Sequence, residues 1–487
     1  MWTARLTPPA PEDVTPFASL KRFRERWNAD ADFRASLPSD PPRIASLFGI
    51  TVDPEEVRPF WDPRTRETIQ RGEAQYASVV KRFLDFTDQL GRHRNDVVRS
   101  IQPADSRFAQ WRTRQIYRLN LEVGTSLSQN PHILASFELS RGCSVGCWFC
   151  SVSPPKLGDV FRYTPENARL WRDVLESVRD IIGPAPTSIC YYGTDPFDNP
   201  DYERFTQDFS EVHGQMPYTS TALPVRDLER TRRLIAGSGP NQLRFSVLSV
   251  GMLNKIHAAF TPEELLLVDV SPRNEGSVEG QQMNFAGRAR EDVKKYQRYH
   301  AGEPLINTPS CRSGFMFNLV DRLIRLSSPC APDDRWPNGE RVYEEAHFHD
   351  ARDVPRILED MIARHMAAEP SEQTTLRFER RLQYEPAVQG FYLDSRYLRQ
   401  RFEDTPEMPF RGKLGALIHS GRHTVSQGIK ILAADCGAQP EAVRGELNHL
   451  FGLGLLDGEP LPSQIDVIVP LSAARSPGES ARRGGAG

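Results

Sequence analysis

Three closely spaced cysteines constrain this chain more than any other feature of its sequence. Cys143, Cys147 and Cys150 are separated by three and by two residues, in a short glycine-containing loop. Three thiolates this close together can ligate three irons of a 4Fe–4S cluster, which leaves the fourth iron without a protein ligand. Phe149, directly before the third cysteine, would place an apolar wall beside such a cluster. The motif therefore predicts an iron–sulfur site with one open iron.

Other interpretations of the same three residues are a zinc knuckle, a disulfide with a spare thiol, or plain buried cysteines. Zinc prefers four ligands, and the sequence near the loop offers no further Cys or His to complete the set. A lone disulfide suits a secreted chain, which this sequence does not resemble. The cluster interpretation is favoured.

The spacing Cys143-x3-Cys147-x2-Cys150, after an expected strand and before an expected helix, resembles the radical S-adenosylmethionine (SAM) superfamily. This resemblance implies that the three cysteines hold a 4Fe–4S cluster and that SAM chelates the open iron. It also implies that one electron, from a reductant such as flavodoxin or ferredoxin, cleaves SAM. The resulting 5′-deoxyadenosyl radical would abstract a hydrogen atom from a substrate.

Composition narrows the class of protein further. Hydrophobic residues make up 39% of the 487 residues, charged residues 26%, and the formal net charge is −3. No run of 18 apolar residues occurs, so we expect no membrane span, and the N-terminus does not read as a signal peptide. The charge gives no case for a general nucleic-acid surface. Seven cysteines, an odd number with three clustered, suit a reducing cytoplasm.

The order of expected elements predicts an α/β protein. Residues 1–130 read as helical, and we expect a helical cap over the core in preference to a leader-like module. From residue 131 to 310, apolar strands alternate with helices, which is typical of parallel βαβ units. The expected strands are 133–139, 188–192, 218–222, 243–250 and 265–270. About six such units would form a partial (β/α)6 barrel, the usual core of radical SAM enzymes, with its chemistry at the C-terminal ends of the strands.

The remainder of the chain divides into three expected parts. Residues 311–405 begin with a hairpin around Asp321 and form a barrel-closing extension. Residues 406–470 read as a winged-helix-like unit, in which Thr424 and Gln427 form a capping box, Gly437 ends one helix and Pro440 begins the next. A strand at 465–469 would complete this unit. The tail, residues 471–487, is expected to be disordered.

Polar residues after the expected strands are candidates for SAM contacts. Gly193, Thr194 and Asp195 follow the second strand, where superfamily members often carry a Gly-Gly-Glu turn that holds the SAM amino group. This sequence departs from that pattern, and a simple turn built on Asp and Pro remains an alternative. Ser246, in the fourth strand, could contact the carboxylate or the ribose of SAM. Asn284 and Arg288 are further candidates for these contacts.

Three stretches together resemble the radical SAM peptide epimerases that mature proteusin-type ribosomal peptides, over roughly residues 100–350. They are residues 139–143, residues 192–200, and Ser328-Pro329-Cys330 with residues 334–337. This resemblance implies conversion of L- to D-residues in a precursor peptide, by Cα hydrogen abstraction and donation of hydrogen from a cysteine thiol. An accessible loop cysteine suits the donor role, so Cys330 is the first candidate and Cys311 the second.

The expected partner is a precursor peptide, both its leader and its core. The winged-helix-like unit could bind the leader as an added strand, while a purely structural role remains comparable. Binding to DNA is less favoured, because the second helix of the unit, with Glu441, Arg444 and Glu446, is not basic. The competing functions are a radical SAM enzyme that forms a thioether or carbon–carbon cross-link, and an iron–sulfur regulator that binds DNA.

Overall fold

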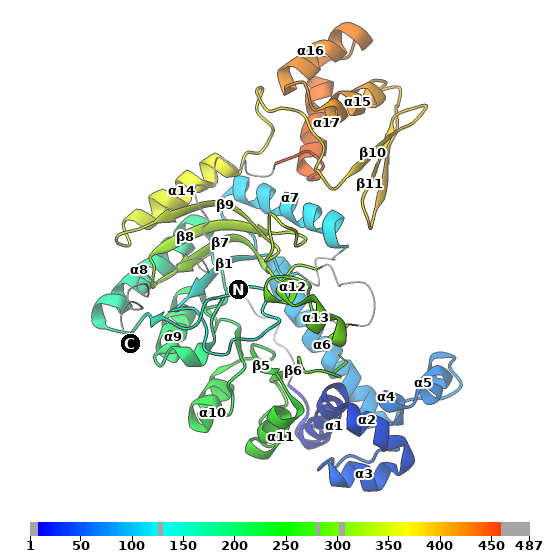
Figure 1. Cartoon of the computed structure of the whole chain (residues 1–487), viewed down its shortest axis with the longest axis vertical. Coiled ribbons are helices and arrows are strands. Elements are labelled where there is room, and N and C mark those ends of the chain that lie inside the picture. The colour runs from blue at the N-terminus through cyan, green and yellow to red at the C-terminus, as the bar shows by residue number, and fades with distance from the viewer. Residues whose placement is uncertain (1–7, 125–129, 279–282, 301–306, 459–487) are drawn as a thin grey trace, which may run out of the picture.

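The computed structural model describes residues 8–124, 130–278, 283–300 and 307–458 (Figure 1). Helices and open sheets alternate through the middle of the chain, so the protein is of the mixed α/β class. The described residues contain no closed barrel. None of their helices combines the length and the apolar character that crossing a lipid bilayer requires.

The N-terminal region is helical, as the sequence predicts. Aspartates begin four of its helices, because their carboxylates accept backbone N–H groups that a helix start leaves unpaired. Helix α1 (Pro11–Ala29) lies against β6 (Asp269–Pro272) and α11 (Val250–Ala259), which agrees with the expected cap over the core. The helices are α1 (Pro11–Ala29), α2 (Ala31–Ser36), α3 (Pro41–Leu47), α4 (Arg58–Trp61), α5 (Pro63–Gln70), α6 (Ser78–Ser100) and α7 (Ser106–Val123).

Two sheets carry the middle of the chain. In the first, β1 (Ile133–Glu138) pairs in parallel with β7 (Arg312–Asn318), and antiparallel β8 (Leu323–Pro329) and β9 (Glu340–His347) follow. The hairpin expected around Asp321 is the β7–β8 connection. In the second, β4 (Thr219–Thr221), β5 (Leu243–Val247) and β6 (Asp269–Pro272) are parallel. Bridges from Ile189 to Ser136 and to Tyr218 link the two sheets into one curved surface.

Helices cover the outer face of this surface. They are α8 (Pro165–Ile182), α9 (Tyr202–His213), α10 (Leu228–Gly237), α11 (Val250–Ala259) and, over β8 and β9, α14 (Asp353–His365). Shorter elements are β2 (Ser140–Arg141), β3 (Asp159–Val160), η1 (Leu37–Ser39), η2 (Pro196–Asp198), α12 (Arg288–Glu291) and α13 (Val293–Tyr299). The apolar faces of the covering helices pack against alternate strand residues. Leu243, Phe245 and Val247, for example, form one buried cluster with Leu253 and Ile256 of α11.

Several expected strand bounds were wrong. Residues 188–192 make isolated bridges and no regular strand. Strand β5 ends at Val247 because Ser249 accepts the N–H of Met252 and begins α11. Strand β6 begins only at Asp269, since turns occupy the residues before it. Asn199 donates its side-chain N–H groups to the carbonyls of Leu139 and Phe161.

The C-terminal unit begins earlier than the expected boundary at residue 406. Strands β10 (Gln383–Pro386), β11 (Phe391–Asp394) and β12 (Arg399–Phe402) share one buried core with α15 (Arg411–Ser420), α16 (Val425–Cys436) and α17 (Pro440–Gly452). The core extends from Leu376 to Leu456, so the sheet and the helices fold together. The capping box of Thr424 and Gln427, the stop at Gly437 and the start at Pro440 are confirmed. The expected strand at 465–469 and the tail 471–487 lie outside the described residues.

A buried histidine next to β1 makes stability depend on pH. Burial lowers the pKa of His132 to about 3, and the Arg112 charge adds to the effect. The unfolded chain therefore binds a proton at His132 below about pH 6.5 that the folded chain does not bind. Stability from this group is complete above pH 6.5 and falls by about 1.4 kcal/mol per pH unit below it. Between pH 7.5 and pH 5.5, the free energy of unfolding measured with urea should decrease less in His132→Asn than in the wild type. Asparagine is chosen because it tolerates the positive φ of residue 132.

Candidate active site

The three clustered cysteines lie in a loop, residues 141–153, that we call the cysteine loop. It leaves β1 through β2, which pairs with β3, and Cys143 donates its N–H to the carbonyl of Pro155 at 3.0 Å. Gly142 adopts a φ of +84°, and a Cβ there would lie 2.4 Å from the carbonyl oxygen of Lys156. A glycine is therefore required at this position for β3 to approach the loop. The loop is held at its other side by Asp198, which accepts the N–H and the hydroxyl of Ser144.

The cysteine loop opens into a cavity of about 470 Å³, which we call the central cavity. Its volume is within the range of about 300–1,000 Å³ found for small-molecule sites. Most of the site residues expected from the sequence line it. These are Cys143, Cys147, Phe149, Cys150, Gly193, Thr194, Asp195, Ser246, Asn284 and Cys311. Cys143 and Cys311, which are 168 positions apart in the sequence, thus line the same cavity.

The lining follows the pleat of the strands. Arg244, Ser246 and Leu248 line the cavity, while the residues between them face the covering helices. Side chains of a strand alternate between the two faces of its sheet, so the cavity lies along the inner face of the curved surface. The cysteine loop lies beyond the C-terminal end of β1. Cys311 lies beside Ile133 at the N-terminal end of this strand, where its carbonyl accepts the Ile133 N–H at 2.8 Å. The two are therefore at opposite ends of the cavity.

Asp195 has a structural task that limits its role toward a ligand. Its carboxylate accepts the Thr221 hydroxyl at 2.8 Å, the Ala222 N–H at 2.8 Å and the Phe197 N–H at 3.0 Å. Burial raises the pKa of Asp195, although these hydrogen bonds oppose the rise. The carboxylate holds the turn against the end of β4. This arrangement agrees with the alternative interpretation, in which Asp195 builds a turn and does not contact SAM. Gly193, with φ +68°, is required because a Cβ would lie 2.6 Å from Glu138 Oε1.

Arg288 is not among the described residues that line the central cavity. Its guanidinium donates to the carbonyl of Cys147 at 3.2 Å and to that of Pro154, and its N–H donates to Cys150 at 3.1 Å. The expected contact of Arg288 with SAM is therefore replaced by a contact with the cysteine loop itself. The side chain holds the loop from behind.

The two candidate donor cysteines are in different environments. Cys311 is partly exposed and lines the central cavity. Cys330 is 0% exposed, packs with Trp336 and Val342, and is not among the residues lining the cavity. The expectation that Cys330 is an accessible loop cysteine was wrong, because the loop after β8 folds back and Cys330 donates its N–H to Gly339. Burial raises the pKa of both thiols.

Several cavity residues were missed by the sequence analysis. Tyr191, Arg244 and Asp269 lie on its inner wall, and Arg94 reaches it from α6. Burial raises the pKa of Tyr191, and the nearby Arg244 charge opposes the rise. A signal was present in β5, where polar Arg244 and Ser246 alternate with apolar neighbours. No comparable local signal marks Arg94, because its helix lies far away in the sequence.

All seven cysteines are free, so the disulfide interpretation is not supported. No group of three or more Cys, His, Asp and Glu side chains in the described residues is already gathered in metal-binding geometry. The donor set nevertheless fits a cluster, because three partly exposed thiols from one short loop face one cavity. Burial raises the pKa of Cys143 to about 11 and that of Cys147 to about 12. These thiols are neutral at pH 7, and a bound metal ion would be needed to stabilise their thiolates.

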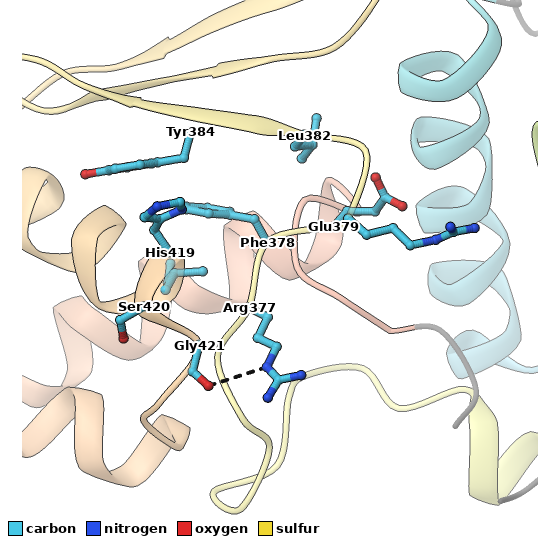
Figure 2. Close-up of a pocket in the computed structure, with 10 residues that line it drawn as sticks. Arg377, Phe378, Glu379, Leu382, Tyr384, His419, Ser420 and Gly421 are labelled. Carbon is cyan, nitrogen blue, oxygen red and sulfur yellow. Dashed lines mark hydrogen bonds between the residues drawn. The ribbon is translucent and has the colours of Figure 1, made fainter. Parts of the chain in front are cut away.

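A second pocket, of about 340 Å³, lies in the C-terminal unit (Figure 2). It is formed between the segment that leads into β10 and the end of α15. Tyr384 stacks on His419 with ring centroids 4.6 Å apart, and Phe378 lies beside them. Arg377 donates to the Gly421 carbonyl at the rim. Strand β10 is at the edge of its sheet.

Comparison with known proteins finds a relative of nearly the same length. The chain is 33% identical over 464 residues to "Uncharacterized protein y4wI" of Sinorhizobium fredii (strain NBRC 101917 / NGR234). The alignment covers 92% of this chain and 88% of that protein. The chain belongs to the y4wI family. No family model and no solved structure matches it.

Proposed function

We propose that this member of the y4wI family is a radical SAM peptide epimerase. The observation that carries the proposal is the central cavity, in which the Cys143-x3-Cys147-x2-Cys150 loop and the separate thiol of Cys311 face the same space. An epimerase of this kind needs both features, because hydrogen must leave one face of a Cα atom and return to the other. The curved surface from β7 through β1 to β6 would correspond to a partial (β/α)6 barrel.

The residues that would hold the cofactors lie at the end of the central cavity that contains the cysteine loop. Cys143, Cys147 and Cys150 would ligate a 4Fe–4S cluster, with Phe149 beside it. Gly193, Thr194, Ser246 and Asn284 would contact SAM, while Asp195 would act mainly by holding the turn. When bound, the cluster and SAM supply a one-electron cleavage that provides a strong hydrogen-abstracting radical.

Cys311 is the proposed hydrogen donor. Its S–H bond would break as a new C–H bond forms at the opposite face of the Cα radical, which leaves a thiyl at sulfur. One electron and one proton, from a reductant such as flavodoxin or ferredoxin and from solvent, restore the thiol. Burial raises the pKa of Cys311, although the Arg312 and Arg244 charges oppose this. The raised pKa keeps the hydrogen on sulfur at neutral pH. The six residues of β1, at about 3.3 Å each, separate the two ends by about 20 Å, which leaves space for SAM and a peptide residue.

The deciding experiment is anaerobic reconstitution with iron and sulfide, followed by reaction with SAM, dithionite and a candidate precursor peptide in deuterated water. We expect 5′-deoxyadenosine, no cross-link, and one deuterium at each inverted Cα, because a thiol exchanges its hydrogen with solvent. Chiral amino-acid analysis after hydrolysis checks the inversion. A product lighter by two hydrogens would instead indicate a cross-linking enzyme and overturn the epimerase proposal.

The C-terminal unit is proposed to bind the precursor peptide. Its edge strand β10 can accept an added strand, and the pocket beside it, with Phe378, Tyr384 and His419, can receive a side chain. Replacing Tyr384 with Ala should weaken peptide binding about tenfold, because a half-buried aromatic contact is lost. Fluorescence anisotropy with a labelled peptide measures this, and Tyr397→Ala, an exposed tyrosine of the same unit, is the control. Equal peptide affinities of the two variants would show that the pocket does not bind the peptide.

A further inference from the structure

One segment of the central core contacts both the C-terminal unit and the cysteine loop. We call this segment, residues 331–339, the strap; it connects β8 to β9 and includes the Asp-Arg-Trp-Pro stretch that the proposed function leaves unexplained. Asp333 organises it, accepting the N–H of Trp336 at 2.7 Å and that of Arg335 at 3.0 Å. Gly339 closes it, with its N–H donated to Trp336 at 2.9 Å.

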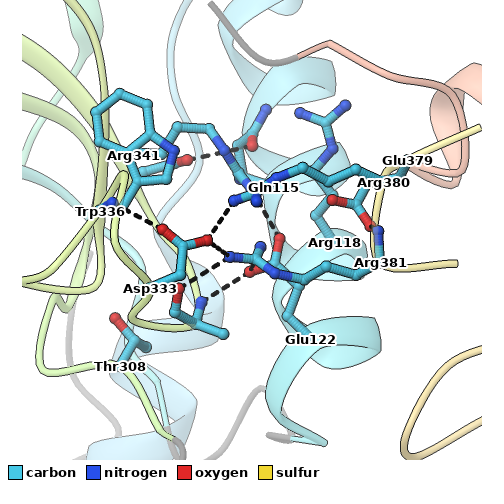
Figure 3. A network of polar contacts seen from close by, with 12 residues as sticks. Gln115, Arg118, Glu122, Thr308, Asp333, Trp336, Arg341, Glu379, Arg380 and Arg381 are labelled. Carbon is cyan, nitrogen blue, oxygen red and sulfur yellow. Dashed lines mark hydrogen bonds and ion pairs between the residues drawn. The ribbon is translucent and has the colours of Figure 1, made fainter. Parts of the chain in front are cut away.

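One side of the strap is clamped by the C-terminal unit (Figure 3). Arg381 donates to Asp333 Oδ2 at 2.5 Å and to the Ala331 carbonyl at 3.0 Å, and Arg380 also pairs with Asp333. Glu122 of α7 completes the clamp, because it pairs with Arg381 at 2.6 Å and accepts the Ala331 N–H at 2.7 Å. Arg341 pairs with Glu122 at 2.8 Å, and both side chains are almost completely buried.

The other side of the strap contacts the support of the cysteine loop. Asn338 donates its side-chain N–H to the Val152 carbonyl at 3.2 Å. The Pro337 carbonyl accepts the Gly287 N–H at 2.8 Å, one residue before Arg288, which holds the Cys147 and Cys150 carbonyls. A path of hydrogen bonds and covalent chain therefore runs from Arg381 to Asp333, from Asp333 to the Trp336 N–H, along the chain to Asn338, and from Asn338 to the cysteine loop.

We propose that the strap is a built-in link that makes the order of the cysteine loop depend on how the C-terminal unit is seated. Charge-assisted hydrogen bonds are among the strongest polar contacts, so the clamp at Asp333 restricts the strap, and the strap restricts the loop. Release of Arg381 from Asp333, for example when a partner shifts the unit, loosens the cysteine loop without touching it. The proposal concerns the loop itself and holds whichever reaction the central cavity performs.

The test measures alkylation rates of Cys147 and Cys150 in the metal-free protein by mass spectrometry under native conditions, where the rate reports opening of the loop. Arg381→Gln should raise these rates about tenfold, since a charged hydrogen-bond donor to Asp333 is lost. Arg444→Gln, which removes an exposed ion pair with Glu372 on the same unit, should leave the rates unchanged. Unchanged rates in Arg381→Gln would overturn the proposal.

A double-mutant cycle separates a link from general loosening. Arg381 and Asn338 act in sequence along the strap, so Arg381→Gln and Asn338→Ala should not multiply in their effects on the alkylation rate. The double variant should be alkylated at nearly the rate of the faster single variant. Asp198→Asn loosens the loop through Ser144, outside the strap, so its effect should multiply with that of Arg381→Gln. Multiplicative effects in both pairs would overturn the link. If Arg381→Gln does not keep a native melting transition, Asp333→Asn replaces it, because its amide oxygen still accepts the Trp336 N–H.

Discussion

Replacing Cys311 with Ser should lower formation of D-residues at least about 100-fold while SAM cleavage continues. The reason is that a serine O–H bond is too strong to quench a peptide radical, although the side chain retains nearly the same size. Cys311 lines the central cavity but lies at the opposite end from the cysteine loop, so the cofactor contacts should be unaffected. Chiral analysis of the peptide and quantification of 5′-deoxyadenosine in one reaction measure both halves.

Cys330→Ser is the matched control for this prediction. Cys330 is completely buried against Trp336 and Val342, so this variant should lose stability but should still invert residues once folded. Inversion that survives in Cys311→Ser and disappears in folded Cys330→Ser would return the donor role to Cys330. Inversion that survives in both variants, without uptake of solvent deuterium, would exclude a thiol donor in the proposed reaction.

Replacing Cys143, Cys147 and Cys150 together with Ala should remove iron binding altogether. The wild-type protein should take up about four irons and four sulfides per chain after anaerobic reconstitution, with visible absorption. The triple variant should bind no cluster and should produce no 5′-deoxyadenosine, because the chain then lacks the thiolate ligands. Iron and sulfide assays with ultraviolet–visible spectra provide the measurement.

The control for the triple variant is Cys436→Ser, which changes a partly exposed cysteine in the C-terminal unit. Its iron content should equal that of the wild type. A full cluster in the triple variant would show that the iron–sulfur assignment of the cysteine loop is wrong.

Local patterns in the sequence were sufficient wherever a few neighbouring residues decide the structure. The capping box of Thr424 and Gln427 and the hairpin around Asp321 are both confirmed. Each is stabilised by hydrogen bonds between residues close in the chain, so the sequence pattern and the structure coincide. The cysteine loop and the turn at residues 193–195, each expected after a strand, both line the central cavity, because parallel strands place their following loops at one edge.

What depends on contacts between distant segments was decided only by the tertiary structure. The sequence does not distinguish the environment of Cys311 from that of Cys330. In the structure the strap buries Cys330, whereas Cys311 is partly exposed in the central cavity. Arg288 donates to the carbonyls of Cys147 and Cys150, and the end of β4 supplies two of the three hydrogen bonds that Asp195 accepts. The sequence by itself determined which residues can bind, donate or cap, because these properties belong to the side chain. Packing determined which of them face the cavity, because burial and many hydrogen-bond partners are contributed by other segments of the chain.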